Sequence, residues 1–482
     1  MSDSKRIEIK NIDHLGIVAG LIDEIGIVKI INEKLGIDER EKISSGKVVK
    51  AMIINGLGMV SKPLYLFSQF YEDRPVEKLL GKEIKGSMLN DDKIGRVMDE
   101  IYKKGLTNLF IEIVLEVIKK FKIKTEYAHL DSTSFHLHGE YKSEEKKEEN
   151  EEIIKERPII ITRGYSRDHR PDLKQSVLDL IVSNDNSIPL LMRTGDGNET
   201  DKKVFGKLLL EFKKQINLES IMVGDSALYS EENIKIMKGI QWITRVPLTI
   251  KKARELIETI KKEEERTQKK LEELEQEEFE EIKIARYQLK MKNKRSKYYS
   301  ISEEKIEEVI NKEKKKVYKI KVKIEKNEEE IERNKSKVGR FILATNILKK
   351  KKLNEAEILL NYKNQQGCEQ GFGFLKDPMF FADSFFVEKP SRVETILWIM
   401  SLCLLVYNLG QRELRNELKR SNNYVKNQVG KLINNPTLRW IFQCFQGIHE
   451  LSMSEEKQII NLTEERGFIL EFLPSSCQKY YL

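Results

Sequence analysis

The stretch NYKNQQGCEQGFGFLKDP, residues 361–378, has the spacing of an amphipathic helix, yet it holds three glycines around a single glutamate, Glu369. Each glycine inside a helix costs roughly 1 kcal/mol relative to alanine. The rest of the chain is rich in lysine and glutamate, which are good helix formers. The glycines therefore need a reason, and the faces of this helix are the place to look for it.

One face of the expected helix is polar. With about 100° between successive residues, four side chains fall within an arc of about 60°, namely Tyr362, Gln365, Glu369 and Lys376. The opposite side contains Gly367 and Gly371, which would let the helix approach another backbone or a nucleic acid closely. The plainer alternative is a solvated glutamate with the glycines in a loop, and the stretch considered alone favours it.

Composition limits the class of protein only broadly. The chain has 482 residues, of which 39% are hydrophobic and 34% charged, with a net charge of +8. A domain of roughly 150 residues is usual, so several domains are expected. The mild basicity is compatible with a polyanionic partner but favours nucleic acid only weakly. Four scattered cysteines without a C-x-x-C pair argue against a disulfide framework and for a reducing compartment.

We expect a soluble, cytoplasmic protein without a membrane span. The N-terminal sequence MSDSKRIEIKNIDHLG lacks the apolar run of a signal peptide. The longest apolar run, ILWIMSLCLLVYNLG from Ile396, is shorter than the roughly 20 residues that a membrane span needs. This run is therefore expected to form a buried helix.

The chain divides by pattern into five segments. Residues 1–124 contain apolar-periodic runs behind cap residues and predict an all-α domain. Residues 125–250 and 338–418 contain short strands, first in a hairpin and then alternating with helices, which indicates a mixed sheet with helices against it. A charged insertion, 251–337, separates these two parts, and residues 419–482 have no clear pattern. A shorter charged run, YKSEEKKEENEEIIKER from Tyr141, predicts a solvated loop.

Three acids stand where an acid is out of place. Asp131 lies inside the alternating strand AHLDSTSF, and Asp225 ends the apolar strand IMVGD. Burying a carboxylate near the end of a sheet is expensive unless it is paired or binds a metal. A close approach of the glycine-containing helix would bring Glu369 to the same sheet edge.

These residues together resemble the DDE transposases, whose ribonuclease H-like core carries two aspartates on strands and a glutamate on a later helix. The stretch 361–378 is similar to the signature of the insertion-sequence-four superfamily, which is tyrosine, two residues, arginine, three residues, glutamate, six residues and lysine. Its positions here are Tyr362, Gln365, Glu369 and Lys376. The motifs LDSTSFHLHGEY, GDSALYS and GFLKDP resemble the large subgroup with a helical N-terminal domain.

The resemblance implies metal-dependent phosphoryl transfer on DNA. Asp131, Asp225 and Glu369 would be the catalytic residues and would hold two Mg²⁺ or Mn²⁺ ions, for which oxygen ligands are suited. Water would first cleave the end of the element, and the freed 3′-hydroxyl would then attack target DNA. The phosphates near the cut would be held by Tyr362, Gln365 and Lys376.

The resemblance also implies partners and domain roles. The protein would be the transposase of a bacterial or archaeal insertion sequence and would bind double-stranded DNA, both terminal inverted repeats and target. Residues 1–124 would bind the DNA ends, and 419–482 are a candidate dimerisation region in a homodimeric DNA complex. His136 and His138, on the strand that carries Asp131, are candidates for DNA contacts or local packing.

Two departures from the family pattern bear on the strength of end binding. Gln365 stands where the signature has arginine, and Gln370 and Gly373 stand where related sequences have basic residues. Two other functions stay open at this point. One is a ribonuclease H-like nuclease without strand transfer, and the other is an inactive DNA-binding scaffold derived from a transposase.

Overall fold

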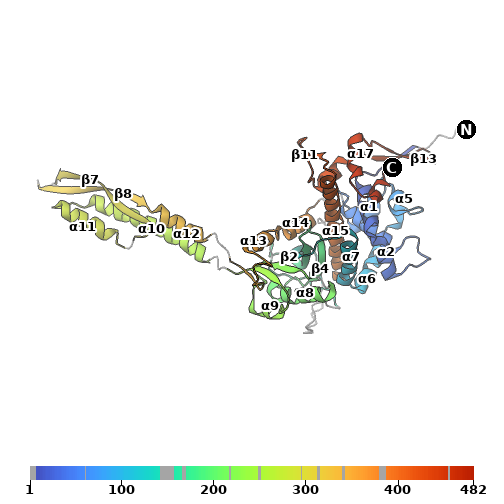
Figure 1. The fold of residues 1–482 in the computed structure, drawn as a ribbon, viewed down its shortest axis with the longest axis horizontal. Helices are drawn as coiled ribbons and strands as arrows, with labels where there is room; N and C mark the ends of the chain where they lie inside the picture. Colours follow the sequence, from blue (N-terminus) through green and yellow to red (C-terminus); the bar gives the residue numbers. More distant parts are fainter. Residues whose placement is uncertain are drawn as a thin grey trace. The chain divides into compact units, whose positions relative to one another are not determined.

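The computed structural model (Figure 1) describes residues 7–59, 61–141, 157–165, 170–216, 219–247, 251–294, 296–311, 315–338, 342–378, 387–453 and 456–482. Its contacts divide the chain into two units, one of Met1–Arg245 with Leu343–Leu482 and one of Val246–Ile342. The charged loop expected from Tyr141 falls almost entirely outside the described residues.

A six-stranded mixed sheet lies at the centre of the first unit, in the order β4-β3-β2-β5-β6-β9. Its strands are β2 (Tyr127–Leu137), β3 (Lys174–Ser183), β4 (Pro189–Gly195), β5 (Ile221–Gly224), β6 (Trp242–Arg245) and β9 (Leu343–Thr345). β2 pairs antiparallel with β3 and parallel with β5, β5 pairs parallel with β6, and β9 is antiparallel to β6. The expected mixed sheet with many helices is confirmed.

The hairpin between β3 and β4 forms where the sequence NDNS predicts a turn. Asn186 and Ser187 have φ values of 56° and 55°, in the left-handed region that tight hairpin turns use. Asparagine tolerates this conformation better than most residues, whereas serine at such a φ is uncommon. The turn therefore holds Ser187 in a defined place, next to the helix that carries Glu369.

Two short helices cover one face of this sheet. They are α13 (Glu355–Lys363), which contacts β5 and β6, and α14 (Gln366–Leu375), which contacts β2 and β3. Tyr362 of α13 packs in an apolar cluster with Tyr127 and Val223. Because side chains alternate along a strand, His129 and Asp131 share the face of β2 that bears Tyr127.

The expectation of one continuous helix from Tyr362 to Lys376 is wrong. α13 ends at Lys363, Asn364 and Gln365 form a turn, and α14 starts at Gln366. Asparagine is a weak helix former, so the helix is interrupted at a residue with low helix propensity. The break lets the chain leave β5 and β6 and cross to β2 and β3, which a straight helix could not do.

A long helix, α15 (Pro390–Arg420), forms the centre of the core of the first unit. It contacts α1, α3, α6, α7, α14 and β4 (Figure 1). In the described part of the chain it is the one helix long and apolar enough to cross a membrane, but 94% of its apolar window is buried inside the protein. The expectation that the run from Ile396 forms a buried helix is confirmed.

The N-terminal region is mainly helical. Its helices are α1 (Leu15–Ile25), α2 (Ile27–Leu35), α3 (Ser45–Gly56), η1 (Leu64–Leu66), α4 (Phe67–Phe70), α5 (Val76–Leu80), η2 (Gly86–Met88), α6 (Asp91–Lys104) and α7 (Leu106–Phe121). Asn90 caps α6 by accepting a hydrogen bond from Lys93 N–H at 2.8 Å, and Ser44 occupies the cap position of α3 without a side-chain bond.

The expectation that this region is entirely α-helical is wrong in one respect. Residues Ile7–Asn11 form a strand, β1, which pairs antiparallel with β12 (His449–Met453), and β12 pairs with β13 (Glu456–Ile460). The alternating stretch IEIKN has the two-residue period of a strand, but its pairing partner lies more than 430 residues away in the sequence.

The C-terminal region packs on these N-terminal helices. Its elements are β10 (Val425–Lys426), β11 (Leu432–Ile433), α16 (Leu438–Cys444), β12, β13, α17 (Glu464–Glu471) and α18 (Ser475–Gln478). α18 contacts α1, and the Tyr481 hydroxyl donates to the carbonyl of Asp13 at 2.6 Å. Residues 419–482, which have no clear sequence pattern and were expected only as a candidate dimerisation region, thus pack partly on the N-terminal region of the same chain. Their role in dimerisation stays a prediction.

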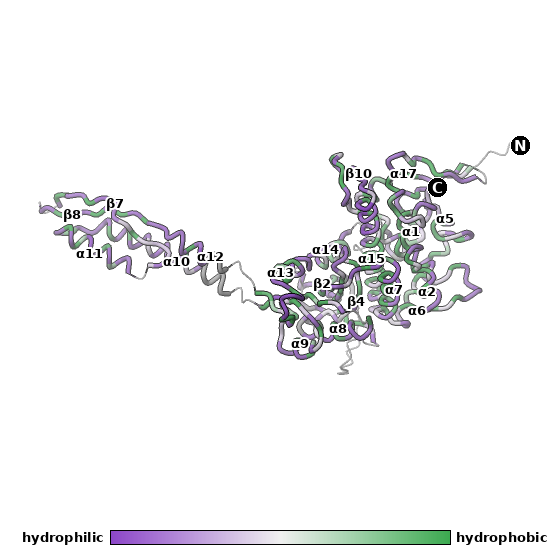
Figure 2. The backbone as a smooth tube through the Cα atoms, viewed as in Figure 1, coloured by the Kyte–Doolittle hydropathy of each residue, from purple (hydrophilic) through white to green (hydrophobic). Residues whose placement is uncertain are grey.

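Three further helices complete the two units: α8 (Asp201–Ile216) and α9 (Glu231–Ile236) in the first, and α12 (Glu328–Val338) in the second. The rest of the second unit comprises α10 (Lys251–Gln276), α11 (Ile282–Lys292) and a hairpin of β7 (Tyr299–Ile310) with β8 (Lys316–Lys326). A small core of Leu274, Phe279, Ala285, Ile301 and Ile320 joins helices to hairpin. Hydrophilic residues are frequent along α10 (Figure 2).

Candidate active site at the ends of three parallel strands

Asp131 and Asp225 lie next to each other where β5 ends, with Asp131 inside the longer strand β2 and Asp225 directly after β5. β2 and β5 run parallel and are paired up to Leu130 and Gly224. The two aspartates are the next residue on each chain, and neighbouring strands are about 4.8 Å apart. The sequence-predicted pair of acids is thus brought to one place by the parallel pairing of two strands that are far apart in the sequence.

Backbone groups fix the direction of both carboxylates. Oδ1 of Asp131 accepts a hydrogen bond from Ser132 N–H at 2.8 Å, and Oδ1 of Asp225 accepts one from Ala227 N–H at 2.9 Å. The Thr244 hydroxyl donates to the carbonyl of Asp225 at 2.5 Å and so ties the end of β5 to β6. Both aspartates are half-buried.

Arg245 is a third member of this row, and the sequence reasoning missed it. β5 and β6 are paired up to Gly224 and Thr244. Arg245 and Asp225 are the next residues on these two strands, so they lie side by side. Its guanidinium hydrogen-bonds the hydroxyl of Tyr362. The sequence shows that an arginine ends the short strand QWITR, but the position of that strand beside β5 comes from the sheet pairing.

Tyr362 links this row to the third acid. Burial raises the pKa of the Tyr362 hydroxyl, Arg245 opposes this effect, and the negative charges of Asp225 and Glu369 add to it. Both carboxylates are therefore close to the same phenol. Tyr362 stays a neutral hydroxyl at physiological pH and can donate one hydrogen bond.

Cys368 fixes the helix that carries Glu369. The Cys368 thiol is buried and donates to the carbonyl of His129 at 3.2 Å, which fixes α14 against β2. Burial raises the pKa of this thiol well above its usual range, and the charges of Asp131 and Glu369 raise it further. Glu369 is the next residue on α14 and is exposed.

Two of the three glycines allow the close approach that the sequence predicts. A Cβ on Gly367 would lie 2.3 Å from Oγ of Ser187, and one on Gly371 would lie 3.2 Å from Leu404. The partners are the β3–β4 turn and α15, so the glycines admit protein neighbours. Nothing lies within 4 Å of a Cβ built on Gly373, and that position is treated below.

The three expected phosphate-contacting residues occupy different environments. Tyr362 is in α13, whereas Gln365 and Lys376 flank the two ends of α14. Gln365 is only 9% exposed and has the least access to DNA. The Lys376 ammonium lies 5.8 Å from the centre of the Phe135 ring, and Phe135 shares with Asp131 one face of β2.

His136 and His138 are not brought to the acids. His136 is the next residue after Phe135 and therefore points to the opposite face of β2 from Asp131. Its charge acts on Asp172. His138 follows the end of the strand and is exposed, so a DNA contact by either histidine stays a prediction.

The carboxylates of Asp131, Asp225 and Glu369 are of the kind that binds a hard divalent cation, but they are farther apart than the ligands of a bound metal ion. Asp131, Asp225 and Glu369 offer only carboxylate oxygens, which Mg²⁺ and Mn²⁺ prefer. In the described ranges, no group of three or more His, Cys, Asp or Glu side chains is close enough to hold a metal ion. The exposed side chain of Glu369 has three rotatable bonds, so it can turn toward the aspartates by changing rotamer.

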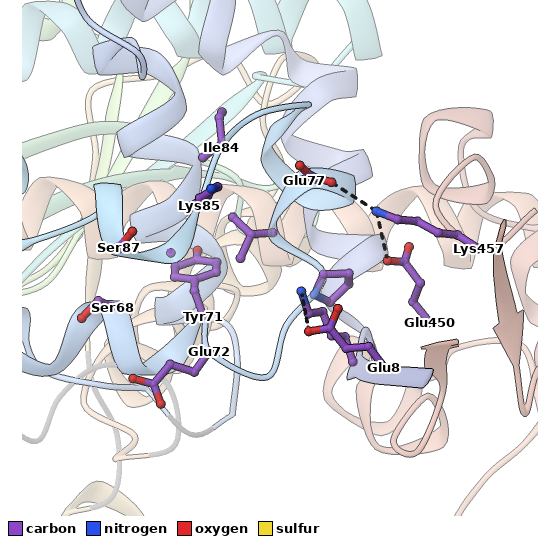
Figure 3. A pocket seen from close by; sticks show the side chains of 14 residues that line it. Glu8, Ser68, Tyr71, Glu72, Glu77, Ile84, Lys85, Ser87, Glu450 and Lys457 are labelled. Carbon is purple, nitrogen blue, oxygen red and sulfur yellow. Dashed lines mark hydrogen bonds and ion pairs between the residues drawn. The ribbon is translucent and has the colours of Figure 1, made fainter. Parts of the chain in front are cut away.

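A separate cavity of about 530 Å³ lies between the N-terminal helices and β1, β12 and β13 (Figure 3). Three of its carboxylates lie near lysines, with Glu77 3.2 Å and Glu450 4.0 Å from the Lys457 ammonium. Glu8 is 3.3 Å from the ammonium of Lys10. None of the three predicted acids lines this cavity, which we therefore do not assign to the chemistry.

Family models match two parts of the chain. A model described as "Transposase DDE domain" matches residues 128–409, which is more than half of the chain. A model described as "Domain of unknown function (DUF4277)" matches residues 7–115. No curated protein matches.

Two solved structures are similar to this chain at low identity. The piggyBac transposase synaptic complex with hairpin DNA has 10% sequence identity and a TM-score of 0.37, and the alignment covers 97% of this chain and 80% of that one. The Mos1 transposase paired-end complex with the left transposon end has 11% identity and a TM-score of 0.17, with 43% and 61% covered.

Proposed function

Because the chain belongs to the family of transposase DDE domains, we propose that it cleaves the ends of a bacterial or archaeal insertion sequence and joins them to target DNA. The family match supports transposase activity in general, while end cleavage and strand transfer belong to the proposal. The observation that supports it is the position of Asp131 and Asp225 side by side on two parallel strands, with Glu369 on a helix, α14, that contacts the strand of Asp131.

In this proposal the three carboxylates hold two divalent cations, Mg²⁺ or Mn²⁺. When bound, such a pair of ions activates the attacking oxygen and stabilises the leaving oxygen in an in-line displacement at phosphorus. Backbone N–H groups orient Asp131 and Asp225 before DNA arrives. Glu369 completes the set by a change of rotamer on a helix that the Cys368 thiol anchors to β2.

The remaining groups of the site position the DNA. Arg245 holds the neutral hydroxyl of Tyr362 beside Asp225, where it can donate to a phosphate oxygen. Lys376, packed on Phe135, supplies a positive charge along the same face, and an ammonium is a good partner for phosphate. Gln365 is a weaker candidate because it is nearly buried.

We further propose a ribonuclease H-like core and membership of the insertion-sequence-four superfamily. The spacing of Tyr362, Gln365, Glu369 and Lys376 supports the superfamily. The sheet order, with antiparallel β4, β3 and β2 followed by parallel β5 and β6, supports the core. The insertion between the second and third acids corresponds to the unit Val246–Ile342.

The other parts of the chain would serve assembly on DNA. We propose that the N-terminal module, residues 1–124 together with the packed residues 419–482, binds the terminal inverted repeats. Two ends must be held together for transposition, so a homodimer on DNA is proposed, working in the cytoplasm. Since 419–482 packs on α1 within one chain, any role in dimerisation would use its outer surface.

The test is cleavage of DNA that carries the inverted repeats found beside the gene, in the presence of Mg²⁺. We expect Glu369→Gln, which keeps the size of the side chain, to abolish cleavage without changing DNA binding. Glu355→Gln, a change of an exposed acid on the neighbouring helix, is the matched control and should cleave normally. Full activity of Glu369→Gln would contradict the proposed mechanism.

The products separate the proposal from its alternatives. A transposase inserts the cleaved end into a second DNA, whereas a nuclease without strand transfer yields only cut fragments. An inactive scaffold binds the repeats and gives no cleavage in wild type or variant. Short direct duplications outside the inverted repeats in the genome would support the transposase.

A further inference from the structure

A second polar cavity, of about 690 Å³, lies on the other side of α14 from β2. It opens between α14, α15, the β3–β4 turn and the start of α16, and the sequence analysis assigns no role to it. Gln370 and Gly373 of α14 line it, together with Arg415 of α15 and Arg439 of α16. Gln370 is the next residue after Glu369, and both side chains are exposed, so the cavity begins one residue from the third catalytic acid.

Arg415 is the unusual group in this cavity. Its Nε–H donates to the carbonyl of Pro436 at 2.8 Å, which fixes the guanidinium. Among the residues that the structure describes, no carboxylate forms an ion pair with it. Burial lowers the pKa of Arg415, and the Tyr407 phenol, itself neutral at physiological pH, opposes this effect.

The rest of the lining leaves the cavity positive. Arg439, whose guanidinium is 2.8 Å from Oδ2 of Asp377, is already paired with the one acid that lines the cavity. Gln411 accepts a hydrogen bond from Leu438 N–H through Oε1. This bond points its amide N–H₂ group away from that backbone, and the group can serve as a further donor.

We propose that this cavity binds a phosphodiester group of the DNA strand that passes Glu369, with the Arg415 guanidinium as its main partner. The guanidinium is planar and offers paired N–H donors that match two phosphate oxygens. Its Nε is used by the Pro436 carbonyl, so the terminal amino groups are the ones that face the phosphate. The inference rests on the proposed function, since it requires DNA at Glu369.

The charge of this cavity comes from outside α14. Gln370 and Gly373 of α14 are uncharged, and the structure places Arg415 of α15 in the same cavity as these two residues. The positive charge near the third acid is therefore supplied from α15. The absence of a side chain at Gly373, where a Cβ would meet nothing within 4 Å, keeps the cavity open.

The experiment measures binding of a fluorescent duplex bearing the inverted repeat to the full chain in EDTA, at several salt concentrations. We expect Arg415→Gln to weaken binding by about tenfold. The slope of log affinity against log salt should become shallower by the amount that corresponds to the loss of about one phosphate contact. Arg415→Lys should restore most of the slope. Arg420→Gln, a change of an exposed arginine on the same helix, is the control and should bind as wild type does.

A second pair of variants avoids any loss of stability from Arg415. Gly373→Glu and Gly373→Gln place side chains of equal size in the open cavity, and both should favour the helix. If an anion binds there, the glutamate variant should bind DNA several-fold more weakly than the glutamine variant. A scrambled duplex should lose affinity equally, because a phosphate contact carries no sequence information.

Equal affinities and equal salt slopes across the Arg415 variants and the Gly373 pair would overturn the proposal. Calorimetric titration with inorganic phosphate distinguishes a site for small free anions from a site for a DNA phosphodiester. If Arg415→Gln abolishes phosphate binding but leaves DNA binding unchanged, the proposal is also overturned. The assay measures binding without metal. Its failure is therefore distinct from failure of the catalytic proposal, which the Glu369→Gln cleavage test decides.

Discussion

The packing of the last residues of the chain on α1 can be tested by the substitution Gly20→Ala, which adds one methyl group. Gly20 lies in the middle of α1, and a Cβ built there would be 2.4 Å from Cα of Cys477 and 2.6 Å from the carbonyl oxygen of Ser476. Distances under 3.0 Å essentially never occur for a real Cβ. The clashing atoms belong to the backbone, so no side-chain rotation relieves them and α18 must move.

The expected cost follows from two opposing terms. Overpacking of this kind costs typically 1–3 kcal/mol, about the upper part of that range where backbone must shift. Alanine inside a helix returns about 1 kcal/mol relative to glycine. We therefore expect Gly20→Ala to lower the free energy of unfolding by about 1–2 kcal/mol. Gly467→Ala in α17, where a Cβ meets nothing within 4 Å, should raise it instead.

Urea unfolding followed by circular dichroism gives the free energies of the two variants, and a thiol reagent reports the local change. The Cys477 thiol is buried in the wild type, so release of α18 should speed its modification, located by peptide mass spectrometry. If Gly20→Ala stabilises the protein as much as Gly467→Ala does, and Cys477 stays protected, α18 does not pack on α1 as described.

Two further predictions concern buried polar groups. Burial raises the pKa of Glu394 to about 7 from 4.5; the folded state therefore holds a proton that the unfolded state releases, so stability falls as pH rises through this interval. Glu394→Gln can keep the bonds to Ile159 N–H and the Thr194 hydroxyl and should remove that part of the pH dependence. Urea titrations of both proteins across this pH interval measure the free energy of unfolding. An equal pH dependence in variant and wild type would contradict the reasoning. At the active site, Arg245→Gln and Tyr362→Phe should each slow end cleavage by about tenfold or more, the value of a hydrogen bond to a charged group. The double variant should be no slower than the worse single variant, and additive losses in measured cleavage rates would show that the two groups do not act together.

Local patterns predicted the strands that carry the acids. The alternation around Asp131 and the short apolar run before Asp225 correspond to β2 and β5, and the sequence NDNS corresponds to the β3–β4 turn. These signals are strong because each depends on the chain within a few residues. The parallel pairing that sets the two acids side by side is non-local, and the local patterns do not predict it.

What the sequence could not supply depends on contacts between distant segments. The turn at Asn364 exists because α13 and α14 pack on different strands, and periodicity within one stretch contains no record of that. Arg245 became visible as a site residue only when β6 was aligned beside β5. The strand β1 was missed because its partner β12 is at the other end of the chain.

The buried helix α15 connects the two halves of the proposed machinery. It meets α14 where Leu404 lies against Gly371, and it meets α1 where Gly410 leaves room for Leu21. The helix is continuous and buried between these points, so the position of Glu369 and the position of the N-terminal module are set by one rigid element. Gly371 of α14 and Gly410 of α15 matter for the same reason, because each allows a close contact between α15 and a neighbouring helix.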